Sequence, residues 1–222
     1  MQPAEEAPRS PTTVTVRAGD VTLPGDLTAP PDAAGIVVFA HGSGSSRLSP
    51  RNRAVASALV QDGLATLLFD LLTREEEIAE RATRHLRFDI PLLASRLVGA
   101  VDWVARQGGL RALPIGLFGA STGAAAALIA ATRTGVRAVV SRGGRPDLAG
   151  DALGRVRCPT LLIVGRADAE VIELNRRAMQ RMPAPTAIHI VPRAGHLFEE
   201  PGALAEVVAV ASQWFGKYLA TA

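Results

Sequence analysis

Residues 115–123 read Ile-Gly-Leu-Phe-Gly-Ala-Ser-Thr-Gly, and a run of strong helix formers, residues 124–130, follows them. A mostly apolar strand thus leads into a G-x-S-x-G pattern and then into a helix, an arrangement that holds a serine on a sharp turn with its hydroxyl exposed. Such a turn strains the backbone of Ser121 and requires small residues two positions away, which Gly119 and Gly123 are. The pentapeptide also arises by chance in a chain rich in alanine and glycine, so its meaning depends on the flanking strand and helix.

Composition indicates a globular protein of ordinary type. The chain has 222 residues, 48% of them hydrophobic, and a formal net charge of +3, which suits one medium-sized domain with a substantial core. Arginines make up nearly all of the positive charge and alternate with acids, so no nucleic-acid patch is predicted. The single cysteine, Cys158, excludes an internal disulfide framework, and we expect it to be a small buried residue. No metal and no organic cofactor are expected.

The polar residues 1–11 contain several prolines and predict a flexible segment, and residues 12–222 predict a single domain. The first of these segments lacks the apolar core of a secretory signal, and no stretch approaches the length of a membrane span. A cytoplasmic protein without a membrane partner is therefore expected. The oligomeric state cannot be read from the sequence, and a homodimer stays open.

Short apolar runs alternate with segments of helical periodicity along most of the chain. Two strands near the N-terminus, 12–17 and 21–28, predict a hairpin, with a bulge or turn at Pro24-Gly25. The later runs predict strands buried on both faces of a sheet. The fold class predicted is therefore α/β, with a mostly parallel twisted sheet and helices on both faces, in which ligands bind at the carboxyl ends of the strands. Buried strands are expected at 35–40 and 65–69, and further strands at 115–118, 138–141, 160–164 and 187–191.

One long connection, residues 71–87, is strongly charged and contains Thr73-Arg74-Glu75-Glu76-Glu77. It favours a solvated loop or a short helix. An alternative interpretation is a flap over the edge of the site.

A serine hydroxyl needs a base, usually a histidine that a carboxylate orients. His196 directly follows the last predicted strand, in a loop that can bring the imidazole toward Ser121, and we expect it to be the base. His189 lies inside that strand between two isoleucines and is predicted to be structural. His85 lies in the charged connection and is predicted to be solvated, while His41 ends a strand and begins a Gly-Ser loop.

The orienting acid is predicted to be Asp168, which follows the strand at 160–164. A carboxylate at a strand end can accept a hydrogen bond from the imidazole and fix its tautomer. Asp147, after the preceding strand, is the rival, and either aspartate could instead cap a helix. The order Ser121, Asp168, His196 is the one expected with this type of turn.

Acyl transfer also needs hydrogen-bond donors for the oxyanion. The backbone N–H of Thr122 is expected to be one donor. The other is expected in residues 41–46, which read His-Gly-Ser-Gly-Ser-Ser, with the N–H of Ser43 favoured and that of Gly44 next. The same loop could be mistaken for a dinucleotide-binding fingerprint, but Arg47 stands where a third glycine is required.

Together these stretches resemble the α/β-hydrolase superfamily and, more narrowly, its dienelactone-hydrolase-like branch. By this resemblance Ser121 is the nucleophile, His196 the base and Asp168 the acid. Dienelactone hydrolases proper use a cysteine nucleophile, so the serine here favours general esterase chemistry over lactone specificity. The resemblance runs from about residue 35 to the C-terminus and is carried by residues 41–46, 49–52, 69–73, 119–123, 165–168 and 195–196.

Two further features of the superfamily bear on this chain. A cap domain often follows the sixth strand, but residues 142–156 are too few to form one, so no cap is expected and the site should be open and shallow. Similar domains occur attached to phosphoribosyltransferase domains. Nothing in this sequence resembles that part, and its activity is not expected here.

The function predicted is a serine hydrolase that cleaves carboxylic esters through an acyl-enzyme, with a small-molecule ester as its partner. Gly42, Gly44 and Arg142 are expected to contact the substrate, and Arg142 could steer an anionic one or could form a surface salt bridge. Amide or peptide cleavage and acyl transfer to an alcohol use the same residues and stay open. So does a non-catalytic binding protein built on this fold.

Overall fold

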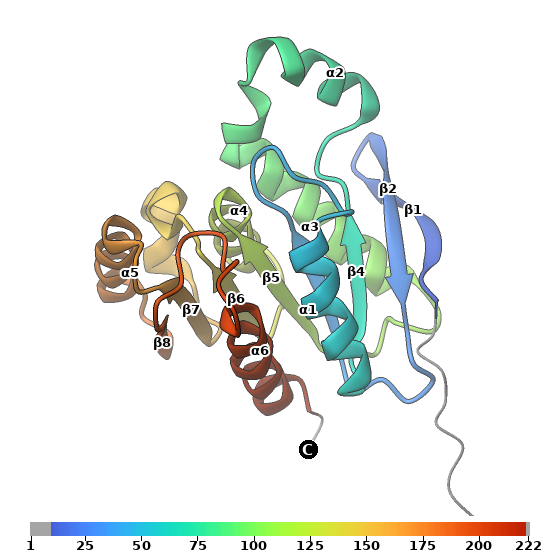
Figure 1. The fold of residues 1–222 in the computed structure, drawn as a ribbon. Helices are drawn as coiled ribbons and strands as arrows, with labels where there is room; N and C mark the ends of the chain where they lie inside the picture. The colour runs from blue at the N-terminus through green and yellow to red at the C-terminus, as the bar shows by residue number, and fades with distance from the viewer. Residues whose placement is uncertain (1–9, 221–222) are drawn as a thin grey trace, which may run out of the picture.

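The computed structural model describes residues 10–220 and contains one eight-stranded sheet with helices on both faces (Figure 1). The predicted fold class is confirmed, and no cap domain follows the sixth strand. The predicted flexible segment, residues 1–11, lies outside the described residues except for Ser10 and Pro11. The strands are β1 Thr12–Ala18, β2 Val21–Thr28, β3 Ile36–Ala40, β4 Ala65–Phe69, β5 Ile115–Ala120, β6 Ala138–Arg142, β7 Thr160–Gly165 and β8 Thr186–Val191.

The sheet has the strand order β1-β2-β4-β3-β5-β6-β7-β8. Strands β3 to β8 run parallel, while β1 and β2 form an antiparallel pair that joins β4 antiparallel. Every residue of β3, β4, β6 and β7 is buried, because helices cover both faces of the parallel part. The carboxyl ends of β3, β5, β6, β7 and β8 therefore meet at one edge, where the candidate residues lie.

The helices divide between the two faces. Helices α1 and α6 pack together on one face, in front of the sheet in Figure 1, and α3 and α4 pack together on the other. Helix α5 lies beside β7 and β8 and contacts η2. The bounds are α1 Pro50–Gln61, α2 Arg74–Thr83, α3 Ile90–Arg106, α4 Thr122–Ala131, α5 Ala169–Arg181 and α6 Ala203–Leu219, with 3₁₀ segments η1 Leu86–Phe88 and η2 Pro146–Arg155.

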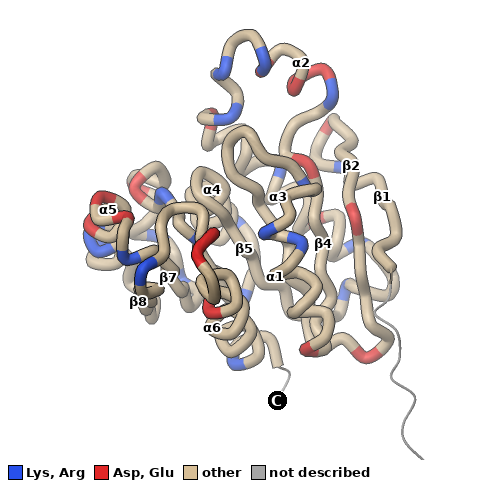
Figure 2. The backbone as a smooth tube through the Cα atoms, in the orientation of Figure 1, with Lys and Arg blue, Asp and Glu red and all other residues tan. Residues whose placement is uncertain are grey.

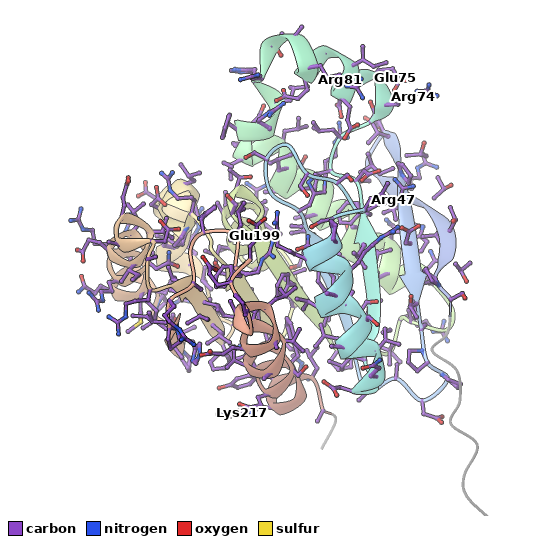
Figure 3. All side chains as sticks on the ribbon, in the orientation of Figure 1. Arg47, Arg74, Glu75, Arg81, Glu199 and Lys217 are labelled. Carbon is purple, nitrogen blue, oxygen red and sulfur yellow. The ribbon has the colours of Figure 1, made fainter. Side chains whose placement is uncertain are left out.

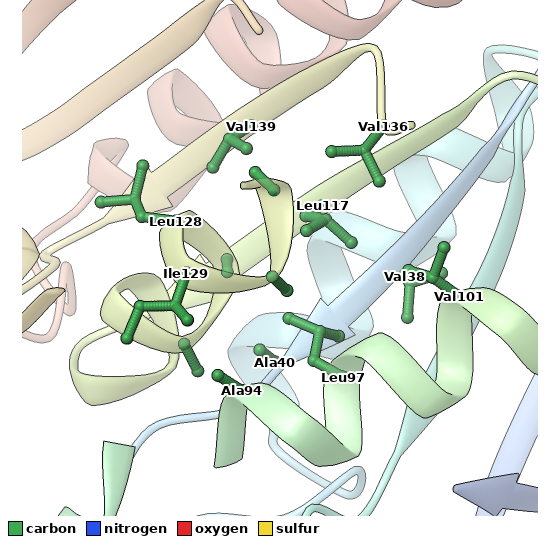
Figure 4. Packing of buried hydrophobic residues seen from close by; sticks show 14 of the residues in the cluster. Val38, Ala40, Ala94, Leu97, Val101, Leu117, Leu128, Ile129, Val136 and Val139 are labelled. Carbon is green, nitrogen blue, oxygen red and sulfur yellow. The ribbon is translucent and has the colours of Figure 1, made fainter. Parts of the chain in front are cut away.

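The core beneath the site is formed by aliphatic side chains of the central strands and of α3 and α4 (Figure 4). Val38, Leu117 and Val139 come from three adjacent strands, and Leu97 and Leu128 come from the two helices. Each of these five side chains is fully buried, which contributes roughly 1.5–3 kcal/mol for a side chain of this size. The strand ends that carry the site are therefore held on a rigid base.

The N-terminal hairpin corrects one expectation. Pro24 and Gly25 lie within β2 and pair with β1, and the turn is instead at Gly19, which has φ 65°. Pro24 is tolerated because β2 pairs with β4 only from Gly25 onward, so no N–H of residue 24 is required there.

The charged connection between β4 and α3 is neither a loop nor wholly solvated. It forms α2 and η1, and α2 begins at a capping box in which Thr73 and Glu76 each accept the other's backbone N–H. Figure 1 shows α2 projecting beyond the carboxyl edge of the sheet. The short-helix interpretation is therefore correct, and the position of α2 also agrees with a flap.

Acidic and basic residues are interspersed along the backbone tube in Figure 2, notably on α2 and α5. Among residues 10–220, no helix has the length and apolar character needed to cross a membrane. Cys158 is buried, as the sequence predicts.

Candidate active site

Ser121 lies on the sharp turn between β5 and α4, with φ 50° and ψ −120°. This backbone conformation costs a non-glycine residue about 1–3 kcal/mol and is found where the surrounding structure enforces it. Glycines two residues before and after Ser121 allow the backbone around it to pack closely enough to hold this conformation. A β-carbon on Gly119 would lie 2.5 Å from the Cα of Ala124, and one on Gly123 would overlap the carbonyl oxygen of Ala40 at the end of β3. The strain and the small neighbours agree with the strand–turn–helix pattern.

The serine faces the first turn of α4. Its backbone N–H donates to the carbonyl of Arg142 at 3.2 Å, which ties the turn to the end of β6. Its hydroxyl neither caps the helix nor makes a hydrogen bond with any residue that the structure describes. The hydroxyl is thus left available for chemistry, beside the positive end of a helix dipole.

His196 and Asp168 are brought together from two different strand ends. His196 Nδ1 lies 2.7 Å from Asp168 Oδ2. Asp168 occupies the N-cap position of α5, yet its side chain makes no capping hydrogen bond. The structure therefore contradicts the alternative that this aspartate serves only as a cap.

The two loops that carry this pair are joined by backbone contacts. The N–H of Ala167 donates to the carbonyl of Ala194 at 2.9 Å. The same carbonyl packs against the backbone of Gly165, where a side chain would collide with it. Glu200 Oε1 accepts the N–H of Gly195 at 2.8 Å. The position of the imidazole is thus set by several bonds on either side of it.

His196 also lies over the strand that neighbours the serine. A β-carbon on Gly143 would lie 3.7 Å from Cε1 of His196 and 3.0 Å from its carbonyl oxygen. Gly143 follows Arg142, whose carbonyl holds Ser121. Within residues 10–220 no hydrogen bond joins the serine hydroxyl to His196, and such bonds are often long before a substrate binds.

The remaining candidates for base and acid lie elsewhere. Asp147 forms a bidentate pair with Arg145, with N–O distances of 2.9 and 2.7 Å. His189 pairs with Glu206 at 2.7 Å on the outer side of β8, and His85 is exposed. Within residues 10–220 no hydrogen bond joins these side chains to Ser121, although the backbone N–H of Arg145 donates to the Ser121 carbonyl at 3.2 Å.

His41 fixes the loop that follows β3. Its Nδ1 lies 3.0 Å from the carbonyl of Gly42, and its Nε2 accepts the N–H of Leu71 at 3.1 Å. Because Nε2 accepts, the proton belongs on Nδ1, and the neutral imidazole joins the ends of β3 and β4. Burial lowers the pKa of His41, and the hydrogen bond to Gly42 and the charge of Asp70 offset only part of this effect.

The predicted oxyanion donor Ser43 has a partner already. Its N–H donates to the hydroxyl of Thr122 at 2.9 Å across the turn. Gly42 packs against Ser121, since a β-carbon there would lie 3.1 Å from the Cβ of the serine. The loop and the serine turn are therefore adjacent. However, the N–H of Ser43, one of the two expected oxyanion donors, is already bonded to the Thr122 side chain, a contact that the sequence did not indicate.

A cavity of about 450 Å³ opens beside this loop. Gly42 and Gly44 line it, and α2 and η1 supply the opposite wall; that the two glycines contact a substrate stays a prediction. Buried Glu80 of α2 pairs with Arg87 Nε and also accepts the N–H of Leu86 at 2.6 Å, so η1 is anchored to α2. The charged connection of residues 71–87 thus forms one wall of this cavity.

Arg142 does not line this cavity, nor does it form a surface salt bridge. Its side chain is 8% exposed and has no hydrogen-bond or ion-pair partner among the described residues. Arg51, at the start of α1, is the nearest charge that affects it and itself pairs with Glu199 at 2.9 Å. Figure 3 labels Glu199 on the loop that follows β8. No signal in the sequence predicted that two arginines would meet here.

Metal ligation is not supported by the side chains in the described part of the chain, where no group of three or more histidine, cysteine, aspartate or glutamate residues is close enough to bind an ion. The chemistry available at the edge is therefore that of a hydroxyl, an imidazole and a carboxylate, close to backbone N–H groups.

A strained serine turn after a parallel strand, with an imidazole–carboxylate pair on the loops of two later strands, defines an α/β-hydrolase architecture. The family model described as "Alpha/beta hydrolase domain" matches residues 33–206. The chain belongs to this family.

Three known proteins illustrate the similarity. The crystal structure of a dienelactone hydrolase from Anabaena variabilis is 58% identical, with a TM-score of 0.92 over 95% of this chain and 100% of that one. Est1E from Butyrivibrio proteoclasticus shares the fold at 15% identity, with a TM-score of 0.78 over 94% of this chain and 99% of its own. A Mycobacterium tuberculosis protein with a provisional phosphoribosyl transferase name is 58% identical over 93% of this chain. The match covers 46% of that protein, so the chain spans about half of its length.

The serine turn predicts a strict requirement for glycine at position 123. We expect Gly123→Ala to lower the free energy of unfolding by about 3 kcal/mol, because the added methyl group would collide with backbone carbonyls that cannot move aside. Gly216→Ala is the control, since that exposed glycine in α6 has open space and should become slightly more stable. Urea unfolding of both variants measures this, and equal stabilities would contradict the packing argument.

The buried imidazole of His41 predicts a loss of stability in acid. The pKa of His41 is lower in the folded protein than in the unfolded chain. Below about pH 6.5, the unfolded chain therefore binds more protons at this residue than the folded protein does. The free energy of unfolding should therefore fall as the pH decreases from 7 to 5, by up to about 1.4 kcal/mol per pH unit from this group.

Urea unfolding at several pH values tests this expectation. His41→Gln should flatten the pH dependence, whereas His85→Gln, at an exposed position, should keep that of the wild type. An unchanged slope in His41→Gln would show that another group causes the dependence.

Proposed function

We propose that this protein is a serine hydrolase that cleaves carboxylic esters through an acyl-enzyme. The observation that carries the proposal is the 2.7 Å contact between His196 Nδ1 and Asp168 Oδ2 at the sheet edge where Ser121 occupies a strained turn. The name of the 58% identical Anabaena protein supports it, since a dienelactone is a cyclic ester. A small-molecule ester that enters the 450 Å³ cavity is the proposed substrate.

The roles follow from the hydrogen bonds. Asp168 accepts from Nδ1 of His196, which leaves Nε2 of the neutral ring free to accept a proton. Nε2 takes the proton of Ser121 as the serine oxygen bonds to the ester carbonyl carbon, and the carbonyl electron pair moves to its oxygen. When that pair returns, the bond to the alcohol breaks, and the alcohol leaves with the proton from His196. Water then loses a proton to His196 and attacks the acyl carbon. The bond to the Ser121 oxygen breaks, that oxygen takes the proton back from His196, and the acid is released.

The oxyanion is proposed to bind the N–H groups of Thr122 and Ser43. The Thr122 N–H lies in the first turn of α4, where four N–H groups have no partner within the helix. The Ser43 N–H must exchange its bond to the Thr122 hydroxyl, or share it, when the oxyanion forms. A hydrogen bond to a charged acceptor is worth about 1.5–3 kcal/mol against about 1 kcal/mol for a neutral one, so the exchange is favourable.

Removal of the nucleophile is the direct test. Ser121→Ala should lose nearly all hydrolysis of p-nitrophenyl esters and should no longer be labelled by a fluorophosphonate probe. Ser95→Ala removes an exposed serine of α3 and should keep both properties. Mass spectrometry of the labelled protein identifies the modified residue. Persistent labelling of Ser121→Ala would assign the nucleophile elsewhere.

The acid can be tested against its rival. Asp168→Asn should lower kcat by about 10⁴-fold with the fold intact, because the amide cannot hold the imidazole in the required tautomer. Asp147→Asn loses only an ion pair with Arg145 that is partly exposed, and should change kcat little. Circular dichroism controls for folding. A large loss in Asp147→Asn and none in Asp168→Asn would reverse the assignment.

A further inference from the structure

Asp70 is a buried acid that the proposed mechanism does not use. It is the first residue after β4 and is 7% exposed. Its Oδ1 accepts the backbone N–H of Arg47 at 2.8 Å, and its Oδ2 accepts Nη1 of the same residue at 2.6 Å. Figure 3 labels Arg47 beside β4. One carboxylate thus holds both the main chain and the side chain of Arg47, which fixes the position and the direction of the chain there.

The residue that follows Asp70 holds the other end of the same loop. The N–H of Leu71 donates to Nε2 of His41 at 3.1 Å. Two consecutive residues after β4 therefore bind both ends of the segment 41–47. Between these two ends lies Ser43, whose N–H is a proposed oxyanion donor.

The anchor itself is tied to the sheet. The N–H of Asp70 donates to the carbonyl of Pro24 in β2 at 3.0 Å. Strand β4 is buried along its whole length and lies between β2 and β3. The carboxylate therefore has little freedom to follow the loop, and the loop takes its position from the carboxylate.

Inside the segment 41–47, the N–H of Ser43 has a partner that must leave. The N–H of Ser45 donates to the carbonyl of Gly42 at 3.1 Å and closes a turn around Ser43. The N–H of Ser43 donates to the Thr122 hydroxyl, and the oxyanion replaces this hydroxyl in the proposed mechanism. During the reaction, the direction of this N–H then depends on the bonds at the two ends of the segment.

Asp70 and Arg47 lie away from the substrate, and their effect on it passes through the loop. Neither residue lines the cavity, whereas Gly42 and Ser43 do. Gly42 also packs against Ser121, since a β-carbon there would lie 3.1 Å from the Cβ of the serine. A displacement of the segment 41–47 would therefore change the distance between the N–H of Ser43 and the reacting atoms.

A second carboxylate shares the charge of Arg47 but not the loop. Asp26 Oδ2 lies 3.5 Å from Nε of Arg47 and 3.2 Å from Nη2 of Arg53. Within residues 10–220, Asp26 accepts no backbone N–H from the segment 41–47. Asp26 and Asp70 are thus both ion-pair partners of Arg47, and of the two only Asp70 holds its main chain.

We propose that Asp70 is a positioning residue for ester hydrolysis: it holds the main chain of Arg47 and so keeps the N–H of Ser43 directed at the oxyanion. The inference rests on the proposed function. The oxyanion exists in the transition state and not in the bound ester, so loss of the anchor should weaken transition-state binding more than substrate binding. Removal of the Asp70 carboxylate should therefore lower kcat and leave KM nearly unchanged.

Steady-state kinetics with p-nitrophenyl butyrate test the proposal. Asp70→Ala should lower kcat by about 10²-fold, the effect of a displaced oxyanion donor, with KM within about threefold of the wild type. Asp70→Asn keeps an oxygen for the N–H of Arg47 but places an amide beside the guanidinium, so it should retain roughly tenfold more kcat than Asp70→Ala. Asp26→Asn removes a charge beside Arg47 without a change to the loop main chain, and both constants should stay within about threefold of the wild type.

A transition-state analogue separates positioning from a general loss of structure. A trifluoromethyl ketone adds to the Ser121 oxygen and forms a tetrahedral oxyanion, so its Ki depends on the same N–H donors. In Asp70→Ala the Ki should rise in proportion to the fall in kcat/KM, and Asp26→Asn should bind the analogue as the wild type does. An unchanged Ki in Asp70→Ala together with a lowered kcat would overturn the positioning role.

Hydrogen exchange measures the anchor without catalysis. The amides of residues 43–48 should exchange faster in Asp70→Ala than in the wild type, and Asp26→Asn should exchange as the wild type does. If circular dichroism shows that Asp70→Ala does not fold, Asp70→Asn replaces it, with smaller changes in the same direction. Unchanged exchange, or an unchanged kcat in a folded Asp70→Ala, would overturn the proposal.

Failure of the proposed function gives a different result. The wild type would then neither hydrolyse the ester nor react with the fluorophosphonate probe. The exchange rates of residues 43–48 in Asp70→Ala and Asp26→Asn would still decide whether Asp70 holds the loop.

Discussion

The close backbone contact between the serine turn and the end of β3 determines where the other functional groups lie. Only glycine at position 123 allows the turn to approach the carbonyls of Ala40 and His41. A second contact of the same kind, at Gly165, allows the loop that carries His196 to lie on the end of β7. Each contact joins backbone to backbone, which side-chain motion cannot relax. The serine and the imidazole–carboxylate pair are thus positioned by the sheet, and the side chains add little freedom of their own.

The loop after β3 is held by neutral hydrogen bonds that an anion can replace. His41 joins this loop to the end of β4, and the Thr122 hydroxyl accepts the N–H of Ser43. A buried N–H without a partner would cost about 1–3 kcal/mol in the resting protein. The hydroxyl avoids that cost, and in the proposed mechanism it gives way to a charged acceptor, which binds the same N–H more strongly. The N–H of Ser43 would therefore bond to the Thr122 hydroxyl in the resting protein and to the oxyanion in the proposed reaction.

The sequence predicts well what depends on local patterns. Apolar runs identified the strands of the parallel sheet, of which β8 at the edge is only half-buried, and the glycine spacing around Ser121 identified the strained turn. The bulge or turn expected at Pro24-Gly25 is absent, because β2 pairs without interruption with β1 there and with β4 only from Gly25 onward, which the sequence does not reveal. The proximity of Arg51 to Arg142 could not be predicted, since it depends on how α1 packs against the loop after β8. The Thr122 hydroxyl was missed for the same reason, because its partner is 79 residues away.

The departures from ordinary folding rules in this molecule gather at one place. Ser121 occupies a strained backbone conformation, α1 begins with basic residues at the wrong end of its dipole, and Arg142 is buried without a counter-ion. Each departure lowers stability by itself, and a sequence under selection for stability alone would remove it by a single substitution. All three lie at the carboxyl edge of the same parallel sheet, which is where such folds bind ligands. Their concentration there is what is expected of a functional edge, because departures from ordinary folding rules persist where a site requires them.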